Sequence, residues 1–308
     1  MVPMYQPRQR SRSEQVPVRT VQYHVRLWGT PRPGQAPLVL LHGWMDVAAS
    51  WQFMVDALQH ERLVIAPDWR GFGLSRAPSA PDSYWFADYL ADLDWLLDHY
   101  AGASPVDLVG HSMGGNVAML YAGIRPERIR RLVNLEGFGL PATQPEQAPA
   151  RYARWIDETK ALHQGKMQLK AYGSADAVAR RLVKTNPRLS PDKADWLARH
   201  WAQPMAAADG ATAWEILGDA AHKITSAQLF RLDETLAIYR QISAPTLAIE
   251  ASDDSLARWH GGAYSLQEYH QRLTHVRDCR VAVVQNAAHM LHHDQPLQLA
   301  GMVEEFLG

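Results

Sequence analysis

The chain has 308 residues, of which 47% are hydrophobic, and a formal net charge of -1 at pH 7. This length exceeds the roughly 100–200 residues of an average domain, but one α/β domain with an insertion accommodates it. The nearly balanced charge excludes a general electrostatic attraction to nucleic acids or anionic membranes, so we expect neither as a partner. The single cysteine, Cys279, excludes an internal disulfide bond and favours a reducing, cytoplasmic location.

The first 17 residues form a polar N-terminal arm that carries Arg8, Arg10 and Arg12. This segment lacks the apolar stretch of a secretory signal, and we expect it to be disordered or loosely docked. No uninterrupted apolar run of the chain approaches the roughly 18 residues of a membrane span.

Short apolar runs recur along the chain and predict the buried strands of a parallel sheet. An alternating stretch at 20–28 comes first, and continuous runs follow at 37–41, 63–66, 106–109, 132–135, 246–249 and 281–284. Helical patterns stand at 84–100 and at 296–307. Strands that alternate with helices predict an α/β fold with an open, doubly wound, mostly parallel sheet.

The segment 138–241 interrupts this alternation. It holds helical patterns at 151–162, 175–184 and 191–201, and it contains no convincing strand. We therefore predict a helical cap, inserted after the sixth strand between two parts of one core, 18–137 and 242–308. Such a cap would cover the strand ends at which α/β sheets bind ligands. Aromatic residues of the cap suit an apolar or aromatic small-molecule substrate, or simply pack the cap on the core: Tyr152, Trp155, Tyr172, Trp196, Trp201 and Trp214.

A serine at the junction of a strand and a helix is the strongest chemical signal. Gly110-His111-Ser112-Met113-Gly114-Gly115 follows the apolar run 106–109 and precedes a helical pattern at 116–124. Small residues around a serine at such a junction are typical of a nucleophile elbow, in which a tight turn exposes the hydroxyl. The helix that starts behind the serine directs its N-terminal amides at any oxyanion formed there.

The chain resembles the α/β-hydrolase family, on four motifs that occur in the family's order. They are His42-Gly43-Trp44, the loop from Asp68 to Ser75, the elbow at Ser112, and the downstream segments that contain Asp254 and His289. The resemblance implies an eight-stranded sheet and a catalytic triad in the order serine, acid, histidine. A hydrolase of this kind needs neither a cofactor nor a metal, and the sequence contains no metal or phosphate motif.

The triad predicted from this resemblance is Ser112, Asp254 and His289. His289 would take the proton of Ser112 and return it to the leaving group. It follows a small residue and precedes an apolar one, which favours it over His292 and His293.

Three residues are candidates for the acid of the triad. Asp254 stands nine positions after Pro245, as in the family, and its neighbour Asp253 is an alternative. Glu136, at the end of the sixth strand, is the main rival, because some family members carry the acid there.

The backbone amides of Trp44 and Met113 are the predicted oxyanion hole, by their places after His42-Gly43 and after the nucleophile. The loop 68–75 is expected to be structural, with Arg70 and its glycines shaping the rim of the site. His111 is expected to point away from the nucleophile and support the turn.

The function predicted from these residues is hydrolysis of a carboxylic ester or a related acyl bond through an acyl-enzyme. The alternative is a cofactor-free dioxygenase of N-heteroaromatic substrates, because such enzymes share the fold, Trp44 and the Trp69-Arg70-Gly71 loop. Gly110 and Met113 depart from the elbow of that group, which favours hydrolysis. A silent binding module would not need all three triad members, and a serine at the elbow argues against dehalogenases and epoxide hydrolases, which use aspartate.

Overall fold

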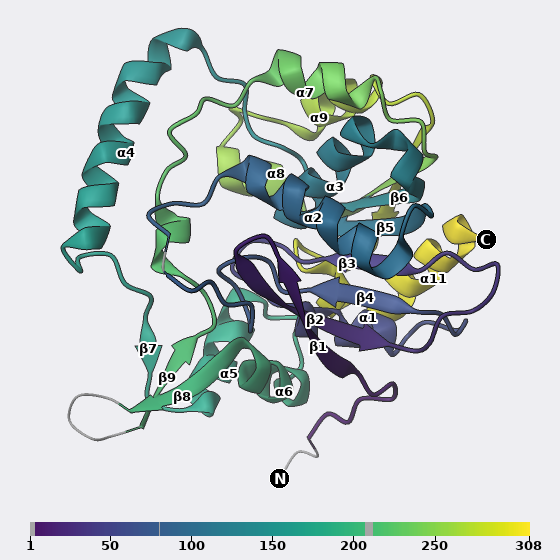
Figure 1. The fold of residues 1–308 in the computed structure, drawn as a ribbon, viewed down its shortest axis with the longest axis horizontal. Helices are drawn as coiled ribbons and strands as arrows, with labels where there is room; N and C mark the ends of the chain where they lie inside the picture. The colour runs from purple at the N-terminus through teal and green to yellow at the C-terminus, as the bar shows by residue number, and fades with distance from the viewer. Residues whose placement is uncertain (1–3, 80, 207–211) are drawn as a thin grey trace.

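The structure is a computed structural model that describes residues 4–79, 81–206 and 212–308. Its centre is an eight-stranded sheet with the strand order β1-β2-β4-β3-β5-β6-β10-β11 (Figure 1). Its strands are β1 (Arg12–Val18), β2 (Val21–Trp28), β3 (Leu38–Leu41), β4 (Val64–Pro67), β5 (Val106–His111), β6 (Ile129–Leu135), β10 (Thr246–Ala251) and β11 (Cys279–Val284). β2 is antiparallel to both β1 and β4, and the other neighbours are parallel. The predicted mostly parallel eight-stranded sheet is confirmed.

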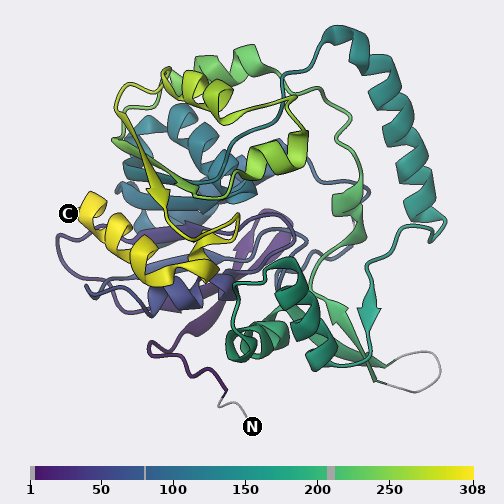
Figure 2. The same ribbon diagram turned by 180° about the vertical axis from the view of Figure 1, so that it is seen from behind.

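Helices cover both faces of the sheet, as Figures 1 and 2 show. One face packs against α2 (Phe86–Ala101), α3 (Met113–Ile124), α7 (Leu232–Tyr239), α8 (Ser255–His260) and α9 (Leu266–Leu273). The other face packs against α1 (Gln52–Val55), α10 (Leu291–Asp294) and α11 (Pro296–Leu307), together with the 3-10 helix η1 (Ala48–Trp51). Successive strand residues point to opposite faces, so Leu108 and Val109 enter different cores. Because both faces are buried, the strands are continuously apolar.

The N-terminal arm is docked, contrary to the expectation of a loose or disordered segment. Residues 12–18 form β1, an edge strand of the sheet. The carboxylate of Asp56 accepts hydrogen bonds from the backbone N–H groups of Arg8 at 2.9 Å and Gln9 at 2.8 Å. The ring of Tyr5 packs edge-on against Phe53, with 5.0 Å between ring centroids. These contacts depend on residues distant in sequence, which the polar composition of the arm does not reveal. Residues 1–3 lie outside the described residues.

The inserted segment is helical, as predicted, but it also contains a small sheet, although the sequence shows no convincing strand there. Its helices are α4 (Ala148–His163), α5 (Ala175–Thr185) and α6 (Pro191–Trp201). Its strands, β7 (Ala171–Tyr172), β8 (Ala202–Ala206) and β9 (Thr212–Ile216), pair in the order β7-β9-β8. β7 has two residues and β8 contains Pro204, so neither has the alternating apolar pattern of a typical strand.

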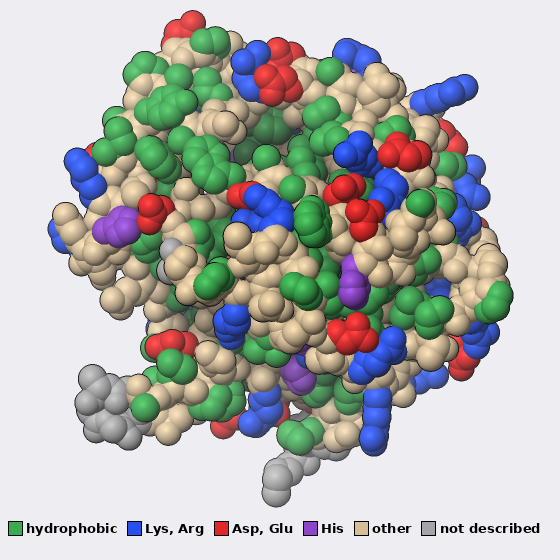
Figure 3. All heavy atoms as spheres, in the orientation of Figure 1, with side chains coloured by type: hydrophobic (Ala, Val, Ile, Leu, Met, Phe, Trp, Pro, Cys, Tyr) green, Lys and Arg blue, Asp and Glu red, His purple; other side chains and the backbone are tan. Residues whose placement is uncertain are grey.

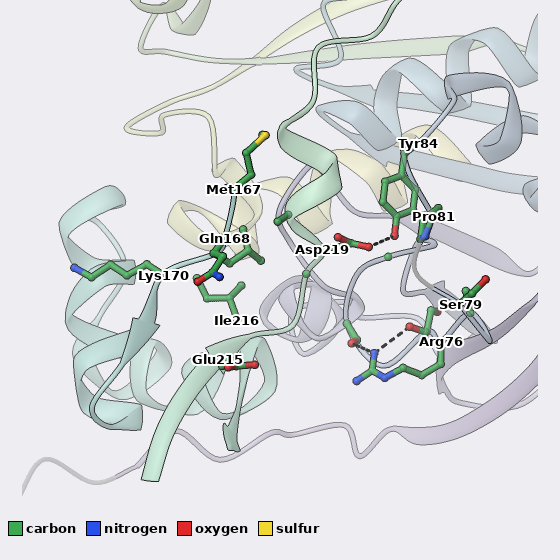
Figure 4. Close-up of a pocket in the computed structure, with 17 residues that line it drawn as sticks. Arg76, Ser79, Pro81, Tyr84, Met167, Gln168, Lys170, Glu215, Ile216 and Asp219 are labelled. Atoms are coloured by element: carbon green, nitrogen blue, oxygen red, sulfur yellow. Dashed lines mark hydrogen bonds between the residues drawn. The ribbon is translucent and has the colours of Figure 1, made fainter. Parts of the chain in front are cut away.

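Part of the predicted cap belongs with the core. Helix α7 packs against α3, so closely that a Cβ on Gly123 would lie 2.2 Å from the carbonyl oxygen of Ile238. The rest of the inserted segment contacts the core at several points, among them Met45, Phe53 and the loop that ends at Tyr84. There the hydroxyl of Tyr84 donates to Asp219 at 2.9 Å, at the edge of a cavity of about 630 Å³ (Figure 4).

The 3-10 helix η4 (Ala220–Lys223) inserts a side chain of the cap into the core. The ring of His222 stacks between Phe72 and Tyr84, with centroid separations of 3.8 and 3.6 Å. Two further 3-10 turns lie at Pro126–Arg128 and Pro145–Gln147. Within the described part of the chain, no helix is long and apolar enough to cross a membrane.

Candidate active site

Ser112 occupies a strained turn between β5 and α3. Its φ of 53° and ψ of -116° are values that residues other than glycine rarely adopt. The backbone N–H of Ser112 donates to the carbonyl of Leu135 at 2.8 Å, and its own carbonyl accepts from Asn116 at 3.0 Å. The turn is thus fixed by β6 on one side and by α3 on the other. Strain of this kind is characteristic of functional positions, and the predicted nucleophile elbow is present.

The neighbouring glycines leave no room for side chains. A Cβ on Gly110 would lie 2.2 Å from the carbonyl oxygen of Gly114, and one on Gly114 would lie 2.3 Å from that of Leu41. A Cβ on Gly115 would lie 2.3 Å from Oδ1 of Asn134. Contacts below 3 Å require the backbone to move, so these small residues are a steric condition of the turn.

His289 pairs with Glu136 from the end of β6. Nδ1 of His289 lies 2.8 Å from Oε2 of Glu136, which is 3% exposed. The same carboxylate accepts from the hydroxyl of Ser255 at 2.8 Å and from the backbone N–H of Ala251 at 2.9 Å. Since a carboxylate only accepts, Nδ1 carries the proton, which leaves the lone pair of Nε2 on the far side of the ring. Like Ser112, Glu136 has a positive φ, of 52°.

The structure does not bring Asp254 to His289, which corrects the choice of acid. Asp254 is exposed and forms the N-cap of α8, where its Oδ1 accepts from the backbone N–H of Ala257 at 2.8 Å. Asp253 pairs with Arg188 at 3.0 Å. The sequence alternative, Glu136, takes the place beside the histidine.

The two amides predicted for the oxyanion hole both lie at the serine. Met113 begins α3 directly after Ser112, and the residues lining the cavity at Ser112 include both Trp44 and Met113. The loop that carries Trp44 touches the elbow, because a Cβ on Gly43 would lie 3.1 Å from Cβ of Ser112. Within the described residues neither of these two backbone N–H groups has a hydrogen-bond partner, so both are free to donate.

His42 holds the loop before Trp44 in place. Its Nδ1 donates to the carbonyl of Gly43 at 2.7 Å, and its Nε2 accepts from the backbone N–H of Trp69 at 2.9 Å. One nitrogen donates and the other accepts, which is the pattern of a neutral imidazole. Burial lowers the pKa of His42, in keeping with that neutral form.

A cavity of about 580 Å³ opens at Ser112, bounded by helices of the core and by the segment after β6. Its aromatic lining comes from Trp44, Phe86, Phe138, Phe230, Tyr239 and Trp259. In Figure 3 the surface is hollowed between α4 and the helices α7 and α8, with hydrophobic side chains around the hollow. Trp259 meets the ring of His289 edge-on at a centroid distance of 4.3 Å, so the histidine packs against a residue of the cavity wall.

The tryptophans predicted to serve the substrate mostly pack elsewhere. Trp196 lies against Phe53, with 5.8 Å between ring centroids, and Nε1 of Trp201 donates to the carbonyl of Met45 at 3.0 Å. Apart from Trp44, the aromatic residues that line the cavity are not predicted from the sequence, because they come from separate segments that only the fold brings together. In the described residues no hydrogen bond joins the Ser112 hydroxyl to His289; such bonds often tighten only when substrate binds.

His111, which is predicted to support the turn, contacts the segment that carries His289. Its Nε2 lies 2.7 Å from the carbonyl oxygen of His289, to which it donates. Burial, with the neighbouring His292 and His289, lowers the pKa of His111 well below 6.5. His111 therefore fixes the backbone of His289 while remaining neutral.

Comparisons with known proteins agree with this geometry. A sequence profile of the alpha/beta hydrolase fold matches residues 36–296. The chain belongs to the α/β-hydrolase fold family. It is similar to a serine hydrolase-like protein of Danio rerio, with 26% identity over 242 residues that cover 77% of this chain and 71% of the relative. Epoxide hydrolase 2 of Siraitia grosvenorii is 41% identical over 104 residues, which are 33% of each chain.

The fold is also that of solved α/β-hydrolase structures. The thioesterase domain from the curacin biosynthetic pathway superposes with a TM-score of 0.80 over 96% of this chain and 99% of that chain, at 23% identity. The family assignment from the sequence is thus confirmed, and the chain is classed with the hydrolases of this fold. Two of these relatives are named for different bonds, an epoxide and a thioester, so the family alone does not determine the reaction.

Proposed function

We propose that the protein is a serine hydrolase that cleaves a carboxylic ester or a related acyl bond. The observation that carries the proposal is the position of Ser112 on the strained turn between β5 and α3. Ser112 lines the same cavity as Glu136, and the carboxylate of Glu136 is the partner of His289. A serine needs an adjacent base to become a nucleophile, and a histidine held by a carboxylate is such a base.

The reaction follows from these positions. Nε2 of His289 takes the proton of Ser112 as Oγ attacks the substrate carbonyl. The backbone N–H groups of Trp44 and Met113 stabilise the oxyanion, and the proton then passes to the leaving alcohol. Water, deprotonated by His289, cleaves the acyl-enzyme and restores the serine. Glu136 keeps the imidazole in the required tautomer and stabilises its charged form.

The substrate class follows from the cavity. Its lining is mainly apolar and aromatic, and polar groups such as Arg151 and Glu234 also line it. Burying an apolar group in such a cavity supplies binding energy, whereas a compact polar acyl group would gain little. We therefore infer a small-molecule substrate with an apolar or aromatic acyl group.

The test is the hydrolysis of p-nitrophenyl esters of increasing acyl length by the wild type and by Ser112→Ala. The wild type should release p-nitrophenol, with kcat/KM rising as the acyl chain lengthens toward the capacity of the cavity. Ser112→Ala should lose roughly 10³-fold or more in kcat. Equal turnover by the two proteins would refute the proposal.

A second candidate is favoured by one observation. Cofactor-free dioxygenases of this fold carry the acid after the sixth strand, which is the place of Glu136. Some hydrolases of the family share that place, and Gly110 and Met113 still depart from the dioxygenase elbow. Oxygen uptake with a hydroxyquinolone-type substrate distinguishes the two: uptake that survives Ser112→Ala would favour the dioxygenase.

A further inference from the structure

Three buried metal-ligating side chains lie together behind the candidate active site. Asp46 follows the loop that carries Trp44, and His292 and His293 are on α10. One oxygen of Asp46 and one nitrogen of each histidine lie within 4.8 Å of one another. The three residues are 5%, 1% and 4% exposed, and they are not among the residues that line the cavity at Ser112.

The hydrogen bonds of this cluster are incomplete. Oδ1 of Asp46 accepts from the hydroxyl of Ser50, but Oδ2 has no partner among the described residues. Nδ1 of His292 and Nε2 of His293 are equally without a partner in that part of the chain. Buried polar atoms are nearly always paired, so the orphaned oxygen of Asp46 and the orphaned nitrogen of His293 indicate a group that binds them. In His292 it is Nε2, and not the orphaned Nδ1, that faces Asp46.

The spacing of two of these residues suits a shared ion better than a direct bond. Nε2 of His292 lies 3.8 Å from Oδ2 of Asp46, which is too long for a hydrogen bond. Two ligands of one ion, each bonded at roughly 2.0–2.2 Å, stand at about this separation. We propose that Asp46, His292 and His293 bind a divalent transition-metal ion. Two imidazoles and one carboxylate favour Zn²⁺ or a similar ion over Ca²⁺ and Mg²⁺, which prefer oxygen ligands.

The ion would join two segments of the candidate active site. Asp46 lies two residues after Trp44, and His292 lies three residues after His289. His111 stands between them, with ring centroids 4.5 Å from His292 and 4.6 Å from His289. Binding would therefore fix the oxyanion loop against the segment of the base. This effect on turnover rests on the proposed function, whereas binding itself does not.

The sequence predicts no metal site, because it contains none of the compact ligand motifs. Here the carboxylate and the two histidines are contributed by segments about 250 residues apart, which only the fold brings together. In the sequence, His292 and His293 read as packing residues around a helix start.

Metal binding by the full chain tests the proposal. Protein stripped with a chelator is titrated with Zn²⁺ by calorimetry, and we expect one equivalent to bind. His293→Gln and Asp46→Asn should each weaken binding by at least about 100-fold, since each removes a ligand. The matched control is His60→Gln, which changes a histidine whose side chain is 78% exposed and should bind as the wild type does. No binding by the wild type, or equal binding by all variants, would overturn the proposal.

A measurement on the wild type alone covers the case in which the variants do not fold. X-ray absorption at the zinc edge should report two imidazole ligands and one carboxylate. A sulfur ligand, which would indicate Cys279, or oxygen ligands alone would overturn the assignment. Ester hydrolysis is then compared in stripped and loaded protein. Loss of hydrolysis in both, with binding intact, would count against the proposed function and leave the metal site standing.

Discussion

Nδ1 of His289 and Oε2 of Glu136 meet at 2.8 Å, across 153 residues of sequence. The glutamate is held in place by two further hydrogen bonds, from Ser255 and from the backbone of Ala251. The carboxylate of Asp254 is used differently, to cap the first turn of α8. One carboxylate thus orients the histidine and the other stabilises a helix terminus.

Replacing each carboxylate by its amide separates these two roles. Glu136→Gln keeps the shape of the side chain but favours the wrong imidazole tautomer, so kcat for ester hydrolysis should fall by roughly 10³–10⁴-fold. Asp254→Asn retains a capping oxygen, and asparagine caps helices about as well as aspartate, so kcat should change less than about twofold. Steady-state kinetics with one p-nitrophenyl ester measures both. A larger loss in Asp254→Asn than in Glu136→Gln would reverse the assignment.

A second prediction concerns the approach of the oxyanion loop to the serine. In Gly43→Ala the new Cβ would lie 3.0 Å from Nδ1 of His111 and 3.1 Å from Cβ of Ser112, so the loop must shift by a few tenths of an ångström. Because Trp44 follows directly, its amide moves away from the oxyanion, and kcat should fall about tenfold. KM and the melting temperature should change little. A melting temperature that falls together with kcat would indicate a folding defect instead.

Much of the fold could be predicted because its signals are local. The apolar runs of the parallel strands and the elbow at Ser112 need only their immediate neighbours in sequence, and the structure has both. Helix α6 (Pro191–Trp201) was predicted with its observed bounds, because Ser190 and Pro191 mark its start.

The predictions are wrong where contacts between residues distant in sequence determine the structure. The docking of Tyr5 on Phe53 and the choice between Glu136 and Asp254 depend on residues that only the fold brings together. The sequence does contain a local indication that Glu136 is a site residue, because Glu136 directly follows a predicted buried strand, as Ser112 does. In the structure both residues adopt a positive φ. The nine-residue spacing from Pro245, in contrast, favours Asp254.

A third prediction tests the buried charge beneath the loop 68–75. The guanidinium of Arg70 binds Asp92 through Nε at 2.5 Å and Nη2 at 2.8 Å, and Asp92 is fully buried. Arg70→Ala leaves this carboxylate without its main partner and should lower the free energy of unfolding by about 3–5 kcal/mol, measured by urea denaturation. Arg154→Ala, which breaks an exposed pair with Glu158, is the control and should cost at most about 0.5 kcal/mol.

If the loss in free energy of unfolding in Arg70→Ala arises from the unpaired charge of Asp92, removing that charge should reverse the loss. The double variant Arg70→Met, Asp92→Leu should therefore recover most of the lost stability. Failure to recover would mean that Asp92 stabilises the fold through its other partners, among them the buried hydroxyl of Tyr23, and is more than a charge that Arg70 neutralises.

The fourth prediction concerns the pH dependence of the contact between cap and core. Burial lowers the pKa of His222 from 6.5 to about 3, where its ring stacks between Phe72 and Tyr84. The unfolded chain takes up this proton near pH 6.5 and the folded protein only near pH 3. The stability that the neutral ring contributes is therefore complete above pH 6.5 and is lost as the pH falls toward 3.

His222→Phe keeps a stacked ring but removes the titration. Between pH 7 and pH 4.5 the wild type should lose about 2–3 kcal/mol more of its free energy of unfolding than the variant does, since each pKa unit corresponds to about 1.4 kcal/mol. Urea denaturation at the two pH values measures this difference. His99→Phe, at an exposed histidine, is the matched control and should follow the wild type. Parallel pH dependence in His222→Phe and the wild type would mean that His222 is charged in the stack, and that the cap is held by Tyr84 and Asp219 without it.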